Sequence, residues 1–306
     1  MRSKMVDRFL GYLIVLATLS CKPKNDLILP VESGDVYLIR VENQEIEINP
    51  QIGGRITSLK LDGENFLTGE EVNANYWGST FWPSPQQAWN GRLSPELDNL
   101  PYEATVEGNI LKLISSVDPA SGYVFTKEIS GHAENASFRI KYSITNRSGE
   151  VQQVAPWEVT RVHPHGLAFF PKGTGDRWGG MADLATDIAG ITWFAYEEEK
   201  IPVRNTKFFS DGSEGWIAQV NNDVIFVKAF PDIPVEHAAP SESEVEIYAN
   251  AEKTYVEIEQ QGAYQALQPG ESLSWEVRWF LRRLPDEIKV EIGNDSLVAY
   301  SRNLVK

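Results

Sequence analysis

The feature that most constrains the fold is a period of two in hydrophobicity, which recurs from about Val36 onward. In the segment Glu45–Ile48 every second side chain is apolar, which is the pattern of a β-strand with one buried face. The segment Arg55–Leu61 continues this pattern and runs into Asp62-Gly63, a dipeptide that favours a two-residue hairpin turn. We therefore expect a protein built of strands joined by tight turns.

Ten further segments have strand character and are separated by turn-forming residues. They are Ile110–Ser115, Tyr123–Ile129, Ser137–Thr145, Val154–Val162, Ile191–Tyr196, Gly215–Val220, Val224–Phe230, Glu244–Ala249, Thr254–Gln260 and Ser272–Leu281. No segment has the period of an amphipathic helix over more than a turn or two, and residues 180–189 come nearest to it. The sequence predicts an all-β protein with one large β-sandwich over residues 36–290 and a tail over residues 291–306.

The first 20 residues have the layout of a signal peptide. A basic start precedes an apolar run from Phe9 to Leu19, which is too short to span a bilayer. The run leads to Cys21, the only cysteine in the chain, in a context that resembles a bacterial lipobox. An ordinary secretory signal is the alternative. We expect a signal peptide at residues 1–20, lipidation of Cys21, a tether over residues 21–35, and a location in the bacterial cell envelope, either periplasmic or at the outer surface.

Charge and motifs exclude several classes of function. The chain has 28 Lys and Arg against 43 Asp and Glu, a net charge of −15, which repels phosphate backbones and anionic headgroups. Nucleic acid is therefore not an expected partner, and a membrane is expected only through the lipid anchor. No phosphate-binding loop, nucleophile elbow or zincin motif is present, so we predict no cofactor and no metal.

An aromatic stretch over residues 76–102 has no strand pattern and contains several prolines. A long loop in a compact domain is usually functional. Indole faces stack on the C–H faces of sugars, and neighbouring amides bind the hydroxyl groups. We predict that Trp82, Gln86 and Trp89 bind a carbohydrate. The alternative is that these aromatic side chains close one end of the sandwich.

Several segments resemble one known family. Ile48–Leu59, followed by a hairpin and Asn65-Phe66-Leu67, is similar to the opening strands of the galactose mutarotase-like superfamily, which includes aldose 1-epimerase. Ala155–Thr160 and Tyr255–Gln260 resemble a bacterial, extracytoplasmic branch of it. The similarity extends over most of residues 36–283. It implies a β-supersandwich in which a concave sheet binds a sugar, so carbohydrate is the expected partner.

In the epimerases a histidine acts as general acid on the ring oxygen and a glutamate as base on the anomeric hydroxyl. The resemblance makes His163 and His165 candidates for the acid, since they follow the strand 154–162. In an extended chain they share a face with Arg161 and Trp157, which we predict to be ligand contacts, whereas Glu158 points to the other face. A His-x-His pair also suits a metal, although the sequence identifies no third ligand, and histidines with a structural role are a further alternative.

For the base, the resemblance points to Glu257 or Glu259, which lie two apart on one strand and share a face. The alternative is a solvated outer face, which we expect for the similar alternation over residues 242–246. Arg55 follows two glycines that permit a close approach, and Lys207 precedes two phenylalanines. Both are candidate ligand contacts, with surface positions as the alternative.

Three hypotheses for function follow. The first is a lipid-anchored protein that binds carbohydrate through a mutarotase-like sandwich. The second is a sugar-active enzyme, either an aldose epimerase-like isomerase or a lyase built on the same sandwich. The third is a structural lipoprotein whose aromatic stretch binds another protein, because an exposed aromatic patch suits glycan and protein alike. The sequence leaves open which sugar is bound, whether catalysis occurs, whether activity depends on a metal, and the oligomeric state.

Overall fold

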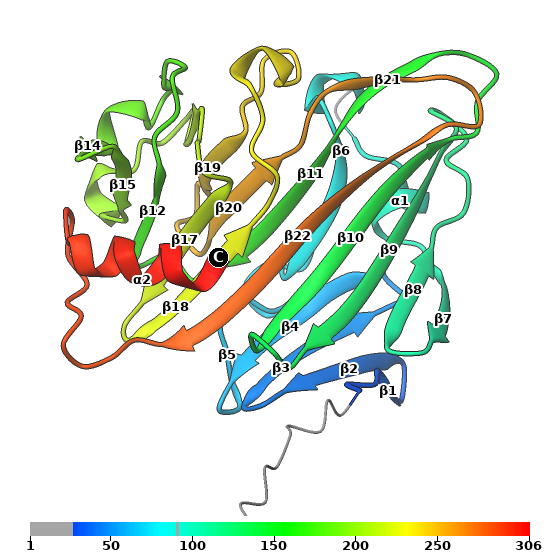
Figure 1. Cartoon of the computed structure of the whole chain (residues 1–306). Coiled ribbons are helices and arrows are strands. Elements are labelled where there is room, and N and C mark those ends of the chain that lie inside the picture. The colour runs from blue at the N-terminus through cyan, green and yellow to red at the C-terminus, as the bar shows by residue number, and fades with distance from the viewer. Residues whose placement is uncertain (1–26, 90–91) are drawn as a thin grey trace, which may run out of the picture.

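The computed structural model describes residues 27–89 and 92–306. The predicted signal peptide (1–20), Cys21 and the start of the expected tether lie outside the described residues. Strands dominate the described chain and form two large antiparallel sheets, which the ribbon shows as two packed layers (Figure 1). The predicted all-β sandwich is confirmed, and all ten listed strand segments coincide with observed strands to within a few residues.

The first sheet has twelve strands. In spatial order they are β1 (Val31–Ser33), β2 (Val36–Val41), β3 (Gln44–Asn49), β4 (Arg55–Leu61), β6 (Ser79–Ser84), β11 (Gln152–Val162), β20 (Val256–Gln261), β19 (Val245–Ala249), β16 (Lys207–Ser210) and β13 (Trp178–Gly179), with β5 (Glu64–Asn65) beside β4 and β21 (Gln265–Leu267) beside β11. Asp62 and Gly63 both have positive φ in the turn between β4 and β5, as the hairpin prediction requires.

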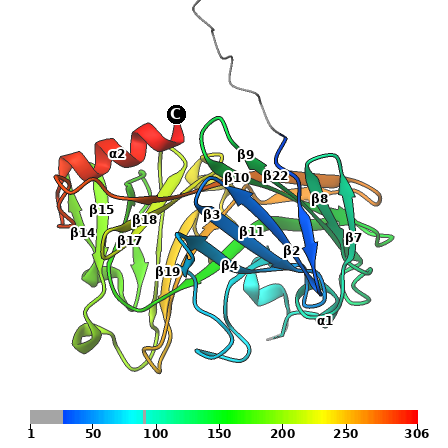
Figure 2. The ribbon, with the colours of Figure 1, turned by 90° about the horizontal axis from the view of Figure 1, so that it is seen from below.

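The second sheet has ten strands. In spatial order they are β14 (Thr186–Ile188), β15 (Ile191–Ala195), β12 (Leu167–Pro171), β17 (Trp216–Asn221), β18 (Val224–Ala229), β22 (Ser272–Arg283), β10 (Ser137–Asn146), β9 (Tyr123–His132), β8 (Ile110–Ile114) and β7 (Glu103–Glu107). Figure 2 shows the molecule from below, with β2, β7 and β8 toward one side and β14, β15 and β17 toward the other.

The expectation of no substantial helix was wrong at the C-terminus. Helix α2 (Asp295–Val305) begins at Asn294, whose side chain caps it by accepting from the amides of Ser296 and Leu297. It lies across the outer face of the ten-stranded sheet (Figure 1), where Leu297 joins a second apolar cluster on β17, β18 and β22. The predicted tail is therefore packed against the domain, and these strands are buried on both faces.

The other helical segments are short. They are α1 (Pro95–Asp98) and the 3₁₀ turns η1 (Gln86–Trp89), η2 (Ala182–Leu184), η3 (Glu198–Lys200) and η4 (Val235–His237). Residues 180–189, the best helix candidate by sequence, form only η2 and the edge strand β14. No helix in the described ranges is long and apolar enough to cross a membrane.

The aromatic stretch 76–102 is not a continuous loop, because it contains β6 at the centre of the twelve-stranded sheet. Proline is normally excluded from central strands because it cannot donate to the ladder. Here Pro83 lies opposite Pro156 of β11. The carbonyl of Pro83 accepts from the Trp89 indole and that of Pro156 from the Gly262 amide, so neither proline needs an N–H group for the ladder between β6 and β11. This arrangement explains why the strand was missed from sequence.

A buried polar network joins the two sheets. Glu158 on β11 points into the core and is fully buried. Its carboxylate accepts from Gln260 on β20 at 2.6 Å, from Tyr142 on β10 at 2.6 Å and from Trp279 on β22 at 3.1 Å. Lys228 on β18 is also fully buried and lies 2.8 Å from the same carboxylate. Burial lowers the pKa of Lys228, although Glu158 opposes that shift.

Removing the lysine tests how much the fold depends on this network. In Lys228→Met the Glu158 carboxylate stays buried without its cation, so we expect a loss of ~3–5 kcal/mol of unfolding free energy, measured by urea denaturation. The double variant Glu158→Gln/Lys228→Met should recover part of that loss. Lys200→Met, which breaks an exposed ion pair with Glu197, is the control and should change stability little. A Lys228→Met variant as stable as the wild type would show that the network is not needed.

Candidate functional site

The site lies on the face of the twelve-stranded sheet that points away from the core. On β11 the side chains of Glu158 and Thr160 are on the core side, so Trp157 and Arg161 share the opposite face, as their spacing predicted. Directly opposite residues in an antiparallel pair share a face. The register therefore places Glu257 beside Arg161 and Glu259 beside Val159. Tyr248 and Glu246 of β19, then Lys207 and Phe209 of β16, continue these two rows.

A cavity of ≈ 630 Å³ opens on this face, and we call it the sheet cavity. Its walls combine aromatic rings with charged and amide side chains. The lining residues are Tyr76, Trp82, Gln86, Trp157, Val203, Arg204, Asn205, Thr206, Lys207, Phe209, Tyr248, Ala251, Tyr255 and Glu257. They come from β6, β11, β20, β19 and β16 and from the loops that adjoin these strands.

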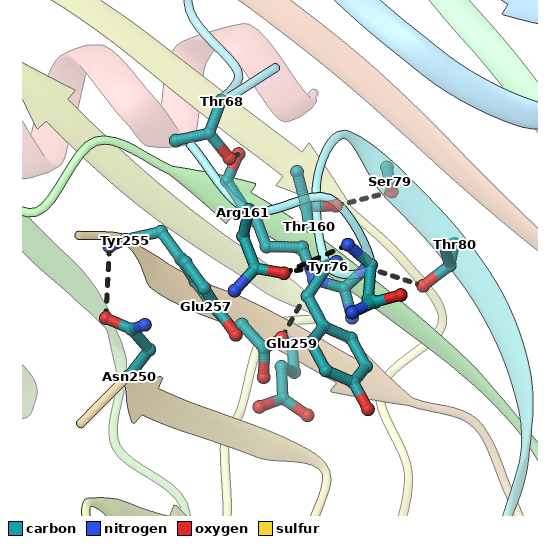
Figure 3. A network of polar contacts seen from close by, with 12 residues as sticks. Thr68, Tyr76, Ser79, Thr80, Thr160, Arg161, Asn250, Tyr255, Glu257 and Glu259 are labelled. Carbon is teal, nitrogen blue, oxygen red and sulfur yellow. Dashed lines mark hydrogen bonds and ion pairs between the residues drawn. The ribbon is translucent and has the colours of Figure 1, made fainter. Parts of the chain in front are cut away.

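Arg161 supports one side of the sheet cavity. Its guanidinium donates from Nε to Glu257 at 2.8 Å and from Nη1 to Thr80 at 2.7 Å (Figure 3). The same group lies 4.8 Å from the ring centroid of Trp82 and 5.8 Å from that of Tyr76. These contacts fix the Glu257 carboxylate and both aromatic rings around one buried cation.

Lys207 supports the other side. Its ammonium lies 2.5 Å from Glu246 and 2.9 Å from Glu259, and 4.7 Å from the ring centroid of Trp157. Burial lowers the pKa of Lys207, but the two carboxylates outweigh burial and raise that pKa above its ordinary value. Burial also raises the pKa of Glu246 and the pKa of Glu259, although Lys207 opposes both shifts. The single ammonium group of Lys207 therefore forms ion pairs with two buried carboxylates.

Four buried polar atoms around the sheet cavity have no hydrogen-bond partner in the described part of the chain. They are Nε1 of Trp157, Nη2 of Arg161, Oε2 of Glu246 and Oε1 of Glu259, although Oε2 of Glu246 lies 2.5 Å from the Lys207 ammonium. These atoms are closed off from solvent, so a molecule in the sheet cavity does not contact them in this conformation. The polar groups that face the cavity are those of the lining side chains, among them Gln86, Asn205 and Glu257.

The structure brings together most of the predicted site residues. Trp82, Gln86, Trp157, Lys207 and Glu257 line the sheet cavity. Arg161 and Glu259 lie beneath it, where they hold Glu257 and Lys207 respectively.

His163 and His165 lie elsewhere. Strand β11 ends at Val162, and both histidines line a separate cavity of ≈ 300 Å³ with Asn221, Asp223 and others. Neither borders the sheet cavity, so they do not face Glu257 or Glu259 across one cleft. Burial and the neighbouring His165 also lower the pKa of His163, so a smaller fraction of this side chain carries the proton that a general acid must donate at neutral pH.

Trp89 and Arg55 are also outside the sheet cavity. Trp89 packs against Trp82 and Trp157 but faces a second cavity of ≈ 620 Å³, at the end of the sandwich. Arg55 is almost fully buried, with Nη2 3.6 Å from Asp98. The close approach expected before Arg55 is present: Gly53 has φ 72°, and a Cβ there would lie 2.1 Å from the carbonyl oxygen of Asp98.

Sequence reasoning missed several residues of the site. Four residues that the sequence did not single out as ligand contacts line the sheet cavity. They are Tyr76 of the aromatic stretch, Phe209, Tyr248 and Tyr255. The segment 242–246, expected to be a solvated face, was also wrong, because Glu244 and Glu246 are buried. Burial raises the pKa of Glu244 to about 8. The sequence did contain one indication of the site: Glu246 and Tyr248 are two residues apart on a strand and therefore share a face. This spacing does not show whether that face is exposed or buried.

No group of three or more His, Cys, Asp or Glu within residues 27–89 and 92–306 is arranged to hold a metal ion. His163 and His165 thus lack a third such ligand among these residues. The sheet cavity offers ion-paired carboxylates, which already have cationic partners within the chain.

Comparison with solved structures identifies the fold. A TPR-domain containing protein from Parabacteroides distasonis superimposes with a TM-score of 0.57 at 15% identity, over 84% of this chain and 49% of that chain, so the present chain spans about half its length. A putative aldose 1-epimerase from Escherichia coli K12 superimposes with a TM-score of 0.55 at 14% identity, over 81% of this chain and 99% of that chain. A galactose mutarotase related enzyme from Lactobacillus acidophilus superimposes with a TM-score of 0.56 at 12% identity, over 83% of this chain and 99% of that chain. The predicted galactose mutarotase-like fold is confirmed.

Sequence comparison assigns the chain to a family whose description names no function. No curated protein matches the chain significantly. A family model described as a domain of unknown function (DUF4380) matches residues 106–282, which is more than half of the chain and includes β11, β16, β19 and β20 of the site. The chain therefore belongs to the DUF4380 family, and its domain has the galactose mutarotase-like fold.

Proposed function

We propose that this protein binds carbohydrate in the sheet cavity and does so outside the cytoplasm, held to the cell envelope by a lipid on Cys21. The observation that carries the binding proposal is that aromatic rings and polar side chains line one cavity, with Trp82, Trp157 and Tyr255 beside Gln86, Asn205 and Glu257. The fold adds support, because solved structures with the same fold have names that refer to an aldose epimerase and to a galactose mutarotase.

The chemistry of the sheet cavity suits a sugar. The flat rings of Tyr76, Trp82 and Trp157 offer faces or edges to apolar C–H groups. Hydroxyl groups of a sugar can accept from the lining side chains of Gln86 and Asn205 and donate to the carboxylate of Glu257. The site is already rigid, since both cations are ion-paired, so little side-chain freedom would be lost on binding.

Binding is a better proposal than anomer exchange. That reaction needs an acid and a base on two sides of one sugar ring. Glu257 lines the sheet cavity and is a possible base, but no described lining residue is a histidine. The nearest positively charged partner of Glu257 is Arg161, a group that does not release its proton in proteins. We therefore assign the cavity to recognition.

Replacing Tyr76 tests the binding site. Its side chain is 47% exposed and lines the sheet cavity, so Tyr76→Ala should weaken sugar binding by ~0.5–1.5 kcal/mol while the melting temperature changes little. Binding is measured on a glycan array and then by calorimetry with the sugars that bind.

The matched control for Tyr76→Ala is Val106→Ala, an exposed apolar side chain on β7 of the other sheet. It should leave both sugar binding and stability unchanged. The proposal fails if wild-type protein binds no carbohydrate on the array, or if Tyr76→Ala and Val106→Ala bind the sugar equally well.

A pH titration tests the state of the buried glutamates. A carboxyl group whose pKa is raised by folding contributes stability that is fully present below its unfolded pKa near 4.5 and is lost as pH rises through the raised pKa. Glu259→Gln removes that titration. The free energy of unfolding of Glu259→Gln, relative to wild type, should therefore increase from pH 5 to pH 9.

The control for the titration is Glu252→Gln, an exposed residue outside the strands, for which the difference from wild type should be flat. A difference for Glu259→Gln that is also flat, or that falls with pH, would mean that Glu259 is charged throughout this range.

Replacing the cysteine tests the anchor. The unique Cys21 follows an apolar run in a lipobox-like context, so Cys21→Ala should move the protein from the membrane fraction to the soluble fraction. A single acyl chain binds membranes only marginally, so the several chains of a bacterial lipoprotein are needed for stable anchoring. Fractionation followed by a high-salt wash measures this. A Cys21→Ala protein that stays with the membrane excludes the lipid anchor.

A further inference from the structure

Two aromatic side chains stand out by their exposure. Among residues 27–89 and 92–306, Tyr76 at 47% and Trp178 at 42% are the exposed aromatic residues, while the others are buried or half-buried. Single exposed apolar side chains are common on protein surfaces, so it is the position of these two rings relative to the sheet cavity that matters. Both rings belong to the same face of the twelve-stranded sheet, and they lie on opposite sides of the sheet cavity.

Trp178 lies on the edge strand β13, opposite Phe209 in the register. The two rings are stacked, with centroids 3.8 Å apart and planes 5° from parallel. Phe209 lines the sheet cavity, and Trp178, stacked on that ring, lines a separate cavity of ≈ 130 Å³ together with Ile233 and Val235. Stacking on Phe209 holds the indole in one orientation, which leaves a rigid platform at this rim.

Tyr76 forms the platform at the opposite rim. It precedes β6, and its ring lies over the Arg161 guanidinium on β11 (Figure 3). From β11 the sheet continues through β20, β19 and β16 to β13. Four strand spacings separate β11 from β13, which is about 19 Å along the sheet. That span is several times the width of one sugar ring.

The buried charged groups between the two platforms are paired within the chain, with two cations for three carboxylates. Arg161 pairs with Glu257, and Lys207 pairs with Glu246 and Glu259. A polyanionic or polycationic ligand would gain little from this surface, because each buried charge there already has a partner. A neutral ligand with repeated apolar faces and hydroxyl groups fits the surface better.

We propose that the ligand is a neutral oligosaccharide chain that crosses the sheet from Tyr76 to Trp178, with one unit stacked on each platform and at least one more unit in the sheet cavity. This inference rests on the proposed function, and it adds that the binding unit is a chain rather than a single sugar. Trp178 is then a distal subsite that a monosaccharide in the cavity does not reach.

The test is a length series measured by calorimetry on the full-length protein. The probes are glucose, mannose and galactose, each with its β-1,4-linked oligomers up to the hexaose. Affinity should rise with chain length for the series that binds. Trp178→Ala should raise Kd for the longest chain by roughly tenfold, the scale of one aromatic stacking contact, and leave Kd for the monosaccharide unchanged. Trp178→Phe should retain most of the affinity, and Val106→Ala should behave as wild type.

The outcomes separate this inference from the proposed function. If the monosaccharide and the hexaose bind equally, or if Trp178→Ala binds the hexaose as wild type does, the chain proposal is overturned and sugar binding in the cavity stands. If no member of any series binds, both fail. Melting curves for the Trp178 variants show whether a loss of affinity comes from the platform or from unfolding.

Discussion

The contact on which the rest of the structure depends is the one between Glu158 and the opposite sheet. A single carboxylate on β11 accepts from β10, β20 and β22 and pairs with Lys228 of β18, so it ties together strands from both layers. Burying a charge is costly unless it is paired and hydrogen-bonded, and every one of these contacts is lost if β11 slips by one residue. The register of β11 and β20 is therefore strongly specified, and with it the positions of Trp157, Arg161, Glu257 and Glu259 on the other face.

The two faces of β11 and β20 differ in what their polar side chains do. Toward the core, Gln260 bonds Glu158. Toward the sheet cavity, Arg161 holds Glu257 and Lys207 holds Glu259. Buried polar atoms without a partner are not confined to this site, since Nε1 of Trp193 and Nε1 of Trp275 are others among the described residues. The galactose mutarotase-like fold accounts for the layered scaffold, but the chemistry of the site comes from these side chains, so function is argued from them.

Much of the fold was predictable because strand periodicity is a local property. The alternation on β11 correctly separated Trp157 and Arg161 from Glu158, and the Asp62-Gly63 turn formed as expected. The predictions that were wrong concerned features that depend on contacts with residues far away in the sequence. Strand β6 was hidden by Pro83, which is tolerated because its backbone polar groups face away from β11. The Glu244–Glu246 alternation looked solvated because sequence does not show which strands flank it. His163 and His165 would have joined the site only if β11 had continued past Val162, and the chain there crosses to β12 of the other sheet.

The most direct test of a carbohydrate site on the twelve-stranded sheet is ¹⁵N-resolved NMR of the indole N–H groups. The signals of the nine tryptophans are recorded while the oligosaccharide series is added. Trp157 has a free buried indole N–H at the sheet cavity, and Trp82 lines the same cavity. Trp193 and Trp216 lie in the apolar cluster under α2 on the far side of the molecule and serve as internal references. We predict that a binding sugar shifts the Trp157 and Trp82 signals and leaves those of Trp193 and Trp216 in place. Shifts confined to Trp89, which faces the end cavity, or spectra unchanged by every sugar, would contradict a carbohydrate site on this sheet.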